Sequence, residues 1–357
     1  MAGEKKKVLV ALSGGVDSST AAAILLEKGY DCSGVFMITS EQPDKAQSNA
    51  EEMAGRLGIK LHILDLRKDF ENVIEYFIGE YKKGRTPNPC VYCNRNIKFG
   101  KLLDFAKDRG ADFFATGHYA RIIKDSNGNF CLYSAQTSKD QSYALAMINP
   151  DRLSNIIFPL GDYTKQQTIT MASKLGLEIK DRYESQEICF IPNDDYISLL
   201  EKRCPELVQT GNIIDSRGKI LGEHKGTHRF TIGQRRGLQV AMGQPYYVTK
   251  IDAENNTITL GPKSEVLSRK LTAENVNWLI NKPKEFFDAK VKIRYNSKAV
   301  AAKVLPFENT AIVEFNEQVP AITPGQLAVF YIEEKIGSRV AGGGWIAGLN
   351  ERHLLQT

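Results

Sequence analysis

The first 66 residues alternate between short apolar runs and longer segments in which apolar residues recur every three or four positions. The apolar runs at 7–12, 32–38 and 60–66 predict buried strands, and the segments 19–29 and 44–59 between them predict helices. A strand–helix–strand–helix–strand order is typical of a parallel sheet with helices on both faces. The sequence therefore predicts an α/β fold built on a doubly wound parallel sheet.

The same alternation continues further along the chain. A helix is expected around 97–109, and the apolar stretch 111–117 predicts another strand, which ends at Gly117. Open parallel sheets bind their ligands at the carboxyl ends of the strands. We therefore expect Gly117 to lie at the ligand-binding edge of the sheet.

The pattern changes after about residue 191 to short alternating segments separated by Gly, Asn, Asp and Pro. Such segments are typical of antiparallel β structure, in a barrel or a sandwich. We expect an α/β domain at 1–199, a small linking domain at 200–268 and a C-terminal β-barrel domain at 269–357.

Composition narrows the class of protein. The 357 residues carry 42% hydrophobic and 25% charged side chains, as expected of a globular protein with more than one core. The N-terminus lacks an apolar leader segment, and no apolar run approaches the roughly 18 residues of a membrane span, so a cytoplasmic location is expected. A net charge of +5 permits a nucleic-acid partner without requiring one. Six cysteines without a leader favour catalysis or metal binding over a disulfide scaffold.

The sequence SGGVDS at 13–18 stands between the first predicted strand and the first predicted helix. Its glycines allow backbone N–H groups to approach an anion closely, and the helix N-terminus adds a positive dipole end. Asp17 is expected to hold Mg²⁺ or to brace the loop. The alternative is a tight turn with Ser18 as an ordinary N-cap. The loop lacks the lysine of the common γ-phosphate-binding loop, which indicates a different use of ATP.

This loop resembles the pyrophosphate-binding loop of the N-type ATP pyrophosphatases, also called PP-loop enzymes. The resemblance implies cleavage of ATP between its α and β phosphates, with AMP left on the substrate. It also implies a nucleotide site in which the adenine lies near Met37 and Gly117 closes the pocket. The expected nucleotide-binding residues are Leu12, Ser13, Gly14, Gly15, Val16, Asp17, Ser18, Ser19, Met37 and Gly117.

Three cysteines lie in two segments and are candidates for reactive thiols or metal ligands. Cys90 and Cys93 form a C-x-x-C pair in RTPNPCVYCNRNIKFG, and Cys189 lies in ESQEICFIPNDDY. A structural zinc site would need a fourth ligand that the sequence does not supply nearby. We expect Arg95, Lys98 and a helix that starts after Cys93 to lower the pKa of these thiols.

Several blocks together resemble the tRNA-specific 2-thiouridylases, the MnmA/TrmU family. They are SGGVDSS, RTPNPCVYCNRNIKF, ATGHYAR, SKDQSYAL, FPLGDYTK, SQEICFIP, FTIGQRRGL, KIRY and PGQLAVFY, in this order along nearly the whole chain. The resemblance implies ATP-dependent transfer of sulfur to C2 of the wobble uridine of tRNA, with an upstream persulfide donor such as a cysteine desulfurase or a relay protein.

The resemblance also assigns roles to two of the cysteines. Adenylation turns the poor leaving group at C2 into a phosphate ester that departs as AMP. Cys189 is expected to carry the persulfide and Cys93 to act as the second thiol. Cys93 would either attack that persulfide to release sulfide or resolve the thiolated intermediate, which leaves a Cys93–Cys189 disulfide to be reduced before the next turnover.

Cys90 departs from the pattern of many family members, which carry aspartate there. Cys90, Cys93 and Cys189 could instead hold three irons of a [4Fe–4S] cluster whose fourth iron binds sulfide. The persulfide and cluster routes therefore both stay open from the sequence. Outside this family, the alternatives are a different PP-loop adenylating synthetase and a non-catalytic tRNA-binding or iron–sulfur carrier protein.

Residues that match tRNA-contacting positions of the family are spread along the chain. Without the resemblance, His118 would be interpreted as a structural hydrogen-bonder, and Arg294 with Tyr295 as one exposed and one buried strand position. Asn88 to Cys90 are expected beside a target base that has left the anticodon stack. The expected tRNA-binding residues are Asn88, Pro89, Cys90, His118, Lys139, Asp140, Gln141, Arg294, Tyr295 and Gln326.

Overall fold

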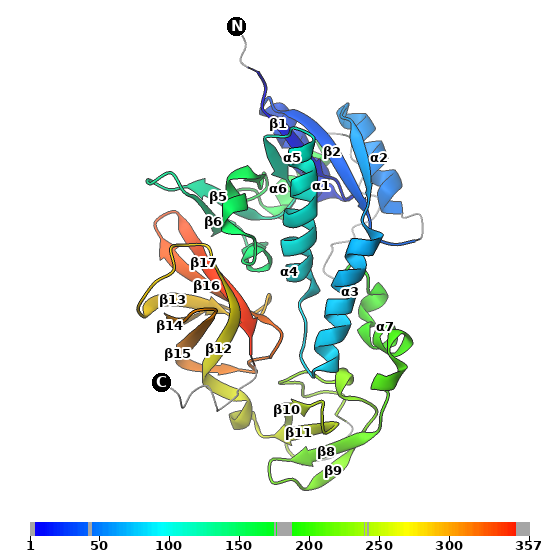
Figure 1. Cartoon of the computed structure of the whole chain (residues 1–357), viewed down its shortest axis with the longest axis vertical. Coiled ribbons are helices and arrows are strands. Elements are labelled where there is room, and N and C mark those ends of the chain that lie inside the picture. Colours follow the sequence, from blue (N-terminus) through cyan, green and yellow to red (C-terminus); the bar gives the residue numbers. More distant parts are fainter. Residues whose placement is uncertain are drawn as a thin grey trace.

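The computed structural model describes residues 4–41, 45–174, 176, 188–238, 240 and 243–347. Figure 1 shows an α/β unit at the top, a β-barrel at the lower left and a small β unit at the bottom. Residues 185–187 of the SQEICFIP block lie outside the described residues. No helix in the described ranges is long and apolar enough to cross a membrane.

The sheet of the α/β unit is parallel throughout, which confirms the predicted doubly wound architecture. The strand order is β3-β2-β1-β4-β7. Strand β1, which the first helix follows, pairs with β2 on one side and β4 on the other. The order of strands along the sheet therefore reverses beside β1. The strands are β1 (Lys7–Ala11), β2 (Asp31–Ile38), β3 (Leu61–Asp65), β4 (Phe113–Ala115) and β7 (Ile156–Ile157).

Helices cover both faces of this sheet because its buried strands carry apolar residues on both faces. Val8 and Val10 of β1 pack with α1 (Val16–Glu27) and α2 (Lys45–Leu57). Leu9, on the opposite face, packs with α3 (Arg67–Lys82) and with the helical residues after Cys93. Two further helices are α6 (Lys165–Lys174), which contacts α1, and α7 (Tyr196–Arg203).

The helix expected around 97–109 begins earlier than predicted. It runs without a break through α4 (Pro89–Cys93), a π-helical segment η1 (Asn94–Leu102) and α5 (Leu103–Asp108). Asn88 caps its start and Pro89 occupies the first turn, where a missing N–H costs nothing. Cys93 therefore lies inside the helix, so the prediction of a helix that starts after Cys93 is wrong.

The small β unit orders its strands β10-β11-β8-β9. Antiparallel pairing was expected after residue 191, but β11 and β8 are parallel. The alternation of apolar residues gives strands, but it does not encode the direction of a partner that lies about forty residues away. The strands are β8 (Gly211–Asp215), β9 (Ile220–His224), β10 (Tyr247–Asp252) and β11 (Thr257–Gly261).

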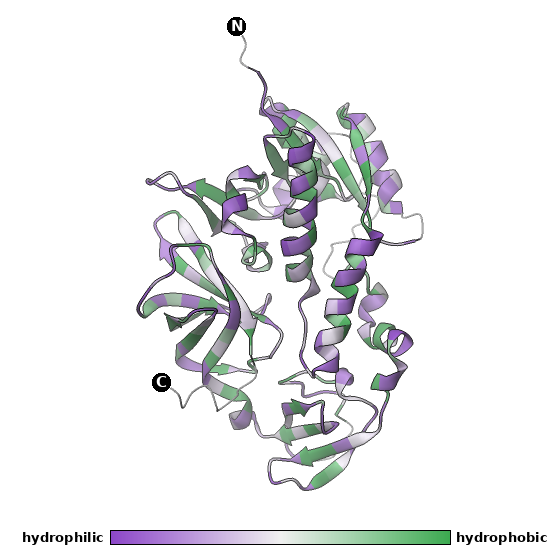
Figure 2. Cartoon of the chain, viewed as in Figure 1, coloured by the Kyte–Doolittle hydropathy of each residue, from purple (hydrophilic) through white to green (hydrophobic). Residues whose placement is uncertain are grey.

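The C-terminal strands close into the predicted barrel, because β12 pairs with both β15 and β17. Apolar residues alternate along these strands (Figure 2), and they form a core of their own. The barrel strands are β12 (Leu267–Trp278), β13 (Phe287–Lys292), β14 (Val300–Pro306), β15 (Thr310–Pro320), β16 (Leu327–Glu334) and β17 (Gly337–Ile346).

The α/β unit contributes a hairpin to the barrel sheet. Its strands are β5 (Ala120–Lys124) and β6 (Phe130–Ser134), and β6 pairs with β17 through Tyr133 and Arg339. The sequence analysis did not anticipate this shared sheet. The short 3-10 helices are η2 (Ser142–Leu145), η3 (Pro150–Asn155), η4 (Pro192–Asp194), η5 (Pro205–Leu207), η6 (Thr227–Arg229) and η7 (Lys263–Val266).

Candidate active site

The loop between β1 and α1 is held closed by its own serines. The Ser13 amide donates to the Ser18 hydroxyl oxygen at 3.1 Å, and the hydroxyls of Ser18 and Ser19 donate to the Gly15 carbonyl at 3.0 Å each. The N-cap of α1 is Gly15, with no side-chain cap, so the alternative of Ser18 as N-cap is wrong. The N-terminus of α1 is thus left open to an anion, which is the arrangement that binds phosphate.

Two glycines allow this loop to pack tightly. Gly14 has a φ of 72°, and a Cβ there would lie 2.4 Å from the Ala46 carbonyl oxygen. A Cβ on Gly117, two residues after β4, would lie 2.8 Å from the Ser18 amide nitrogen. Larger residues would push the loop and helix α1 away from their neighbours. Gly117 therefore lies at the expected edge of the sheet, against the first turn of α1.

Asp17 braces the loop through two residues that the sequence analysis missed. Both carboxylate oxygens lie 2.8 Å from the Lys165 ammonium, and the Tyr119 hydroxyl donates to Oδ1 at 2.8 Å. Lys165 is the first residue of α6 and ends the FPLGDYTK block. A lysine absent from the loop sequence thus reaches the loop from a helix about 150 residues away. No spacing rule in the sequence connects the two positions.

Met37 lies near the carboxyl end of β2, next to β1, and its side chain packs on the core of the α/β unit. This is the same sheet edge from which the phosphate loop leaves β1. The position is compatible with an adenine beside Met37, which stays a prediction.

The two segments that contain Cys90, Cys93 and Cys189 lie near each other. All six cysteines are free; Cys93 is buried, whereas Cys90 and Cys189 are exposed to solvent. Cys93, Cys90 and Lys98 all act electrostatically on the Cys189 thiol, so residues almost a hundred positions apart share one site. The structure therefore brings together the three cysteines that the sequence singled out.

The thiols are not activated in this ligand-free arrangement. Although part of Cys90 and of Cys189 reaches solvent, desolvation of the thiols by surrounding groups raises the pKa of Cys90 and Cys93, and desolvation together with the two neighbouring thiols raises the pKa of Cys189 to about 12. Lys98 lowers these pKa values, but by less than burial raises them. The predicted lowering of the thiol pKa is therefore wrong here, because desolvation of a thiolate outweighs one nearby cation.

A metal cluster would need several of these side chains close together. Within the described ranges, no three side chains of His, Cys, Asp or Glu lie close enough together to hold a metal ion. The described residues therefore show no evident cluster site at Cys90, Cys93 and Cys189, and the cluster route has no support in the structure.

The barrel holds the segment that leads into α4. The Gln326 amide donates to the carbonyls of Thr86 and Pro87 at 3.0 Å each, and the Thr86 amide donates to the Pro324 carbonyl at 2.9 Å. Asn88 follows directly and accepts from the Val91 amide at 3.3 Å. Gln326, predicted to contact tRNA, thus fixes the backbone on which Asn88, Pro89 and Cys90 are presented.

The segment 139–141 is placed beside the barrel. Asp140 accepts from the amides of Ala135 and Ser142 at 2.9 and 3.1 Å, and Gln141 accepts from the Tyr119 amide at 3.0 Å. The next aromatic residue, Tyr143, donates its hydroxyl to the Leu327 carbonyl at 2.9 Å. Lys139, between these anchors, is partly buried.

Arg294 and Tyr295 follow strand β13 of the barrel. The Arg294 guanidinium donates to the carbonyls of Ile232 and Ala321 at 3.1 and 2.7 Å and to the Thr323 hydroxyl. It therefore ties the segment before β10 to the barrel. Tyr295 is 41% exposed, and its ring meets that of Tyr143 edge to face at 6.1 Å.

His118 is neutral around physiological pH. Desolvation lowers its pKa well below 6.5, and Lys98 lowers it further. Its Nδ1 shares a hydrogen bond of 2.7 Å with the Thr116 hydroxyl, and the rings of Phe99 and Phe158 lie beside it. His118 can therefore offer a hydrogen bond to a ligand, but not a positive charge.

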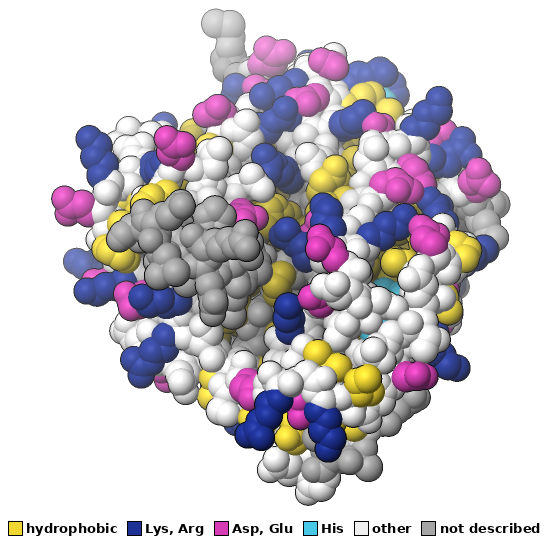
Figure 3. All heavy atoms as spheres, turned by 60° about the horizontal axis from the view of Figure 1, so that its bottom comes forward, with side chains coloured by type: hydrophobic (Ala, Val, Ile, Leu, Met, Phe, Trp, Pro, Cys, Tyr) yellow, Lys and Arg dark blue, Asp and Glu magenta, His cyan; other side chains and the backbone are white. Residues whose placement is uncertain are grey.

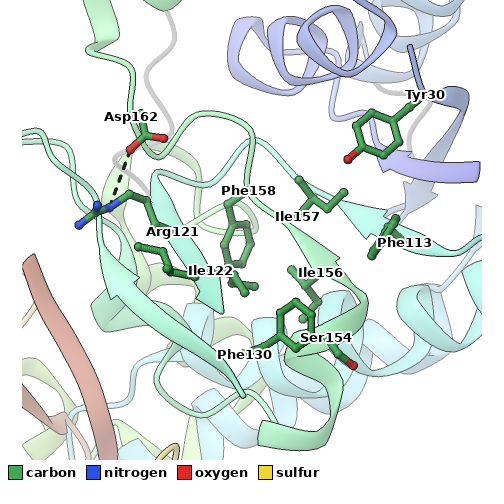
Figure 4. A pocket seen from close by; sticks show the side chains of 11 residues that line it. Tyr30, Phe113, Arg121, Ile122, Phe130, Ser154, Ile156, Ile157, Phe158 and Asp162 are labelled. Carbon is green, nitrogen blue, oxygen red and sulfur yellow. Dashed lines mark ion pairs between the residues drawn. The ribbon is translucent and has the colours of Figure 1, made fainter. Parts of the chain in front are cut away.

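A cavity of about 380 Å³ lies elsewhere in the α/β unit. Figure 4 shows that Tyr30 and Phe113, at the amino ends of β2 and β4, line it on one side and that Arg121, paired with Asp162, lines it on the other. The phosphate loop leaves the opposite, carboxyl ends of the strands. None of the residues lining this cavity belongs to the expected nucleotide or tRNA set, so it is not the candidate active site.

Comparison with known proteins places the chain in a family. Residues 6–193 match the family described as the tRNA methyl transferase HUP domain, residues 198–262 the tRNA methyl transferase PRC-barrel domain and residues 268–346 the aminomethyltransferase beta-barrel domain. These descriptions mention methyl transfer, whereas the relatives that match the whole chain are named for thiolation.

Two such relatives illustrate the match. The chain is 45% identical to the tRNA-specific 2-thiouridylase MnmA of Pelobacter propionicus, over 97% of this chain and 99% of that protein. It is also 45% identical to the protein of the same name from Carboxydothermus hydrogenoformans, over 96% and 98%. With identity at this level over nearly the full length of both proteins, the chain belongs to the tRNA-specific 2-thiouridylase MnmA family.

Proposed function

We propose that this chain is an ATP-dependent tRNA uridine 2-sulfurtransferase that adenylates the C2 oxygen of the wobble uridine and replaces it with sulfur from a persulfide. The observation that supports the proposal is that one molecule contains two sites, one suited to phosphate and one formed by thiols. An open helix N-terminus, braced by Asp17 and Lys165, follows β1, and the thiols of Cys93 and Cys189 share a second site.

The first half of the reaction would take place at the phosphate loop. The amides of the first turn of α1 and the Ser13 and Ser18 hydroxyls would bind the β and γ phosphates, which leave as pyrophosphate. Mg²⁺ would neutralise charge on the leaving group, and Asp17 would bind it by exchanging its ion pair with Lys165 for the metal ion. Met37 and Gly117 would border the adenine.

The second half would take place at the thiols. The terminal sulfur of a Cys189 persulfide attacks C2, and AMP departs with the original oxygen. The Cys93 thiolate then attacks the Cys189 sulfur, which breaks the bond to the transferred sulfur and leaves 2-thiouridine and a Cys93–Cys189 disulfide. An external dithiol, or two monothiols in turn, supplies the two electrons that reduce this disulfide and leaves as the oxidised disulfide.

The target base would be presented by the segment Asn88–Cys90, which Gln326 holds from the barrel. Flipping the base out of the anticodon stack would bring C2 to both reacting groups. His118, Lys139, Asp140, Gln141, Arg294 and Tyr295 are proposed as tRNA contacts. The upstream sulfur donor and a cytoplasmic location stay predictions.

The test is thiolation of an unmodified tRNA transcript by the purified chain with ATP and a small-molecule persulfide. We expect 2-thiouridine by mass spectrometry, with AMP and pyrophosphate formed in equal amounts. Cys93→Ala and Cys189→Ala should abolish thiolation, whereas Cys131→Ala, at a buried cysteine of β6, should retain it.

The same assay separates the alternatives. Pyrophosphate release without any need for tRNA or for either cysteine would indicate a different adenylating synthetase. Tight tRNA binding without AMP formation would indicate a non-catalytic tRNA-binding protein. Activity that requires about four irons per chain would contradict the persulfide route.

A further inference from the structure

Lys292, the last residue of β13, occupies an unusual position for a lysine. Its ammonium lies 5.8 Å from the centre of the Tyr143 ring and 5.5 Å from the centre of the Tyr295 ring. The side chain is half-buried, and burial lowers its pKa. Two tyrosine faces therefore hold a cation that has lost part of its hydration.

The position of this cation relative to negative charges is also unusual. Within the part of the chain that the structure describes, the Lys292 ammonium has no paired counter-charge and makes no ion pair and no hydrogen bond. Asp140 acts on it from a distance and raises its pKa, but the Asp140 carboxylate already accepts from the amides of Ala135 and Ser142. A partly desolvated ammonium without a partner favours an incoming anion.

Lys290 provides the contrast on the same strand. It lies two residues earlier, so its side chain leaves the same face of β13. Lys290 is exposed and pairs with Glu333 at 3.4 Å. The missing counter-charge is therefore a property of position 292 and not of this face of the barrel.

The surroundings of Lys292 indicate which anion it would meet. The ring of Tyr295 is exposed beside it, and the Asn88 side chain interacts with the hydroxyl of Tyr143, the second ring that Lys292 contacts. The cation thus lies near an exposed aromatic ring and is connected through Tyr143 to the segment proposed to receive the target base. A phosphate next to a ring that can stack on a base is the pattern of single-stranded nucleic acid.

Single cations matter on this molecule because its surface is not uniformly basic. Figure 3 shows lysine and arginine side chains interspersed with aspartate and glutamate over the face in view. A net charge of +5 is small for binding a polyanion by charge alone. A cation that makes no ion pair with the described residues and lies close to the reaction site then contributes more to positioning the tRNA than a cation already held in an ion pair.

We propose that Lys292 contacts a backbone phosphate of the tRNA next to the flipped uridine, with the adjoining nucleotide stacked on Tyr295. This inference rests on the proposed function, since it assumes that tRNA is the substrate. It adds a phosphate-binding residue to the set that the sequence predicted, which included Arg294 and Tyr295 but not Lys292.

The first experiment measures binding of the unmodified tRNA transcript over a series of salt concentrations. We expect Lys292→Met to weaken binding roughly three- to tenfold at low salt and to reduce the slope of log affinity against log salt by about one. Lys292→Arg should restore the slope, and Lys290→Met, the matched control, should leave affinity and slope unchanged. An unchanged slope in Lys292→Met would overturn the proposal.

A second measurement needs no variant and so does not depend on how the variants fold. The wild-type chain is treated with an amine-acetylating reagent with and without tRNA, and acetylation is mapped by mass spectrometry. tRNA should protect Lys292 several-fold and leave Lys290 unprotected. Equal acetylation of Lys292 in both conditions would also overturn the proposal.

The wild-type thiolation assay keeps the two claims apart. If the wild-type chain thiolates tRNA but tRNA does not protect Lys292, only this inference fails. If the wild-type chain neither binds nor thiolates tRNA, the proposed function fails with it.

Discussion

At the scale of single residues, the two thiols proposed to react differ in burial but share a raised pKa. Cys93 is buried and Cys189 is exposed, yet the groups around both disfavour the thiolate. A thiol that stays protonated is a poor nucleophile and resists oxidation. The ligand-free enzyme thus keeps its sulfur chemistry suppressed. A bound persulfide donor or tRNA would have to change the surroundings before sulfur moves.

Because the pKa of Cys189 is raised, we expect an unusual pH dependence for its alkylation. Because its pKa is raised to about 12, the thiolate fraction should rise about tenfold per pH unit throughout the accessible range. The measurement is the rate of iodoacetamide labelling of Cys189 in the ligand-free chain, followed by mass spectrometry. A labelling rate that is half-maximal at about pH 8.5 and then levels off, as for a free cysteine, would contradict this expectation.

A variant of Lys98 tests the electrostatic part of this effect in the same experiment. Lys98 is the cation that lowers the pKa of Cys189, so Lys98→Met should slow the labelling at every pH. Lys101→Met removes a cation from the same helix that pairs with Asp69, and it should leave the labelling rate unchanged.

At the scale of elements, the proposed phosphate site depends on the contact between α1 and α6. The Lys165 ammonium, at the start of α6, is held on Asp17 in the first turn of α1, and Tyr119 supports the same carboxylate. The lysine that the loop lacks is thus supplied by another helix. Its charge lies where the phosphates of a nucleotide would enter.

Replacing Lys165 should therefore weaken the ATP-dependent step. We expect Lys165→Met to reduce kcat/KM for ATP roughly 10- to 100-fold, since a charged hydrogen bond is worth about 1.5–3 kcal/mol. Lys174→Met, on the exposed last turn of the same helix, is the matched control and should change little. The measurement is pyrophosphate release at varied ATP. Equal kcat/KM in both variants would contradict the assignment.

Elements also show what the sequence could predict. Strands β1, β2 and β3 and the helices between them follow from local apolar patterns, and the loop after β1 follows from Gly14 and Gly15. The π-helical segment η1 does not, because its extra residue per turn depends on tertiary contacts. Arg152, some fifty residues away, donates to the carbonyls of Phe99 and Gly100 at 3.0 Å each, which a regular helix would bond internally.

At the scale of the whole molecule, the barrel holds segments of the candidate active site in place. Gln326 fixes the backbone before Asn88, β17 pairs with the β5–β6 hairpin, and Arg294 ties the segment before β10 to the barrel. The sequence predicted three domains and most of the candidate site residues, the latter largely through resemblance. It did not predict these contacts, because each joins residues far apart in the chain and carries no local pattern.

The central claim is that ATP activates the C2 oxygen of the tRNA uridine before sulfur arrives. The most direct measurement uses a tRNA substrate labelled with ¹⁸O at C2 of the wobble uridine. The account predicts that the AMP released during thiolation carries the ¹⁸O, because the oxygen of the adenylate leaves with the phosphate. Thiolation that yields AMP without ¹⁸O would show that the C2 oxygen is not adenylated and would contradict the account.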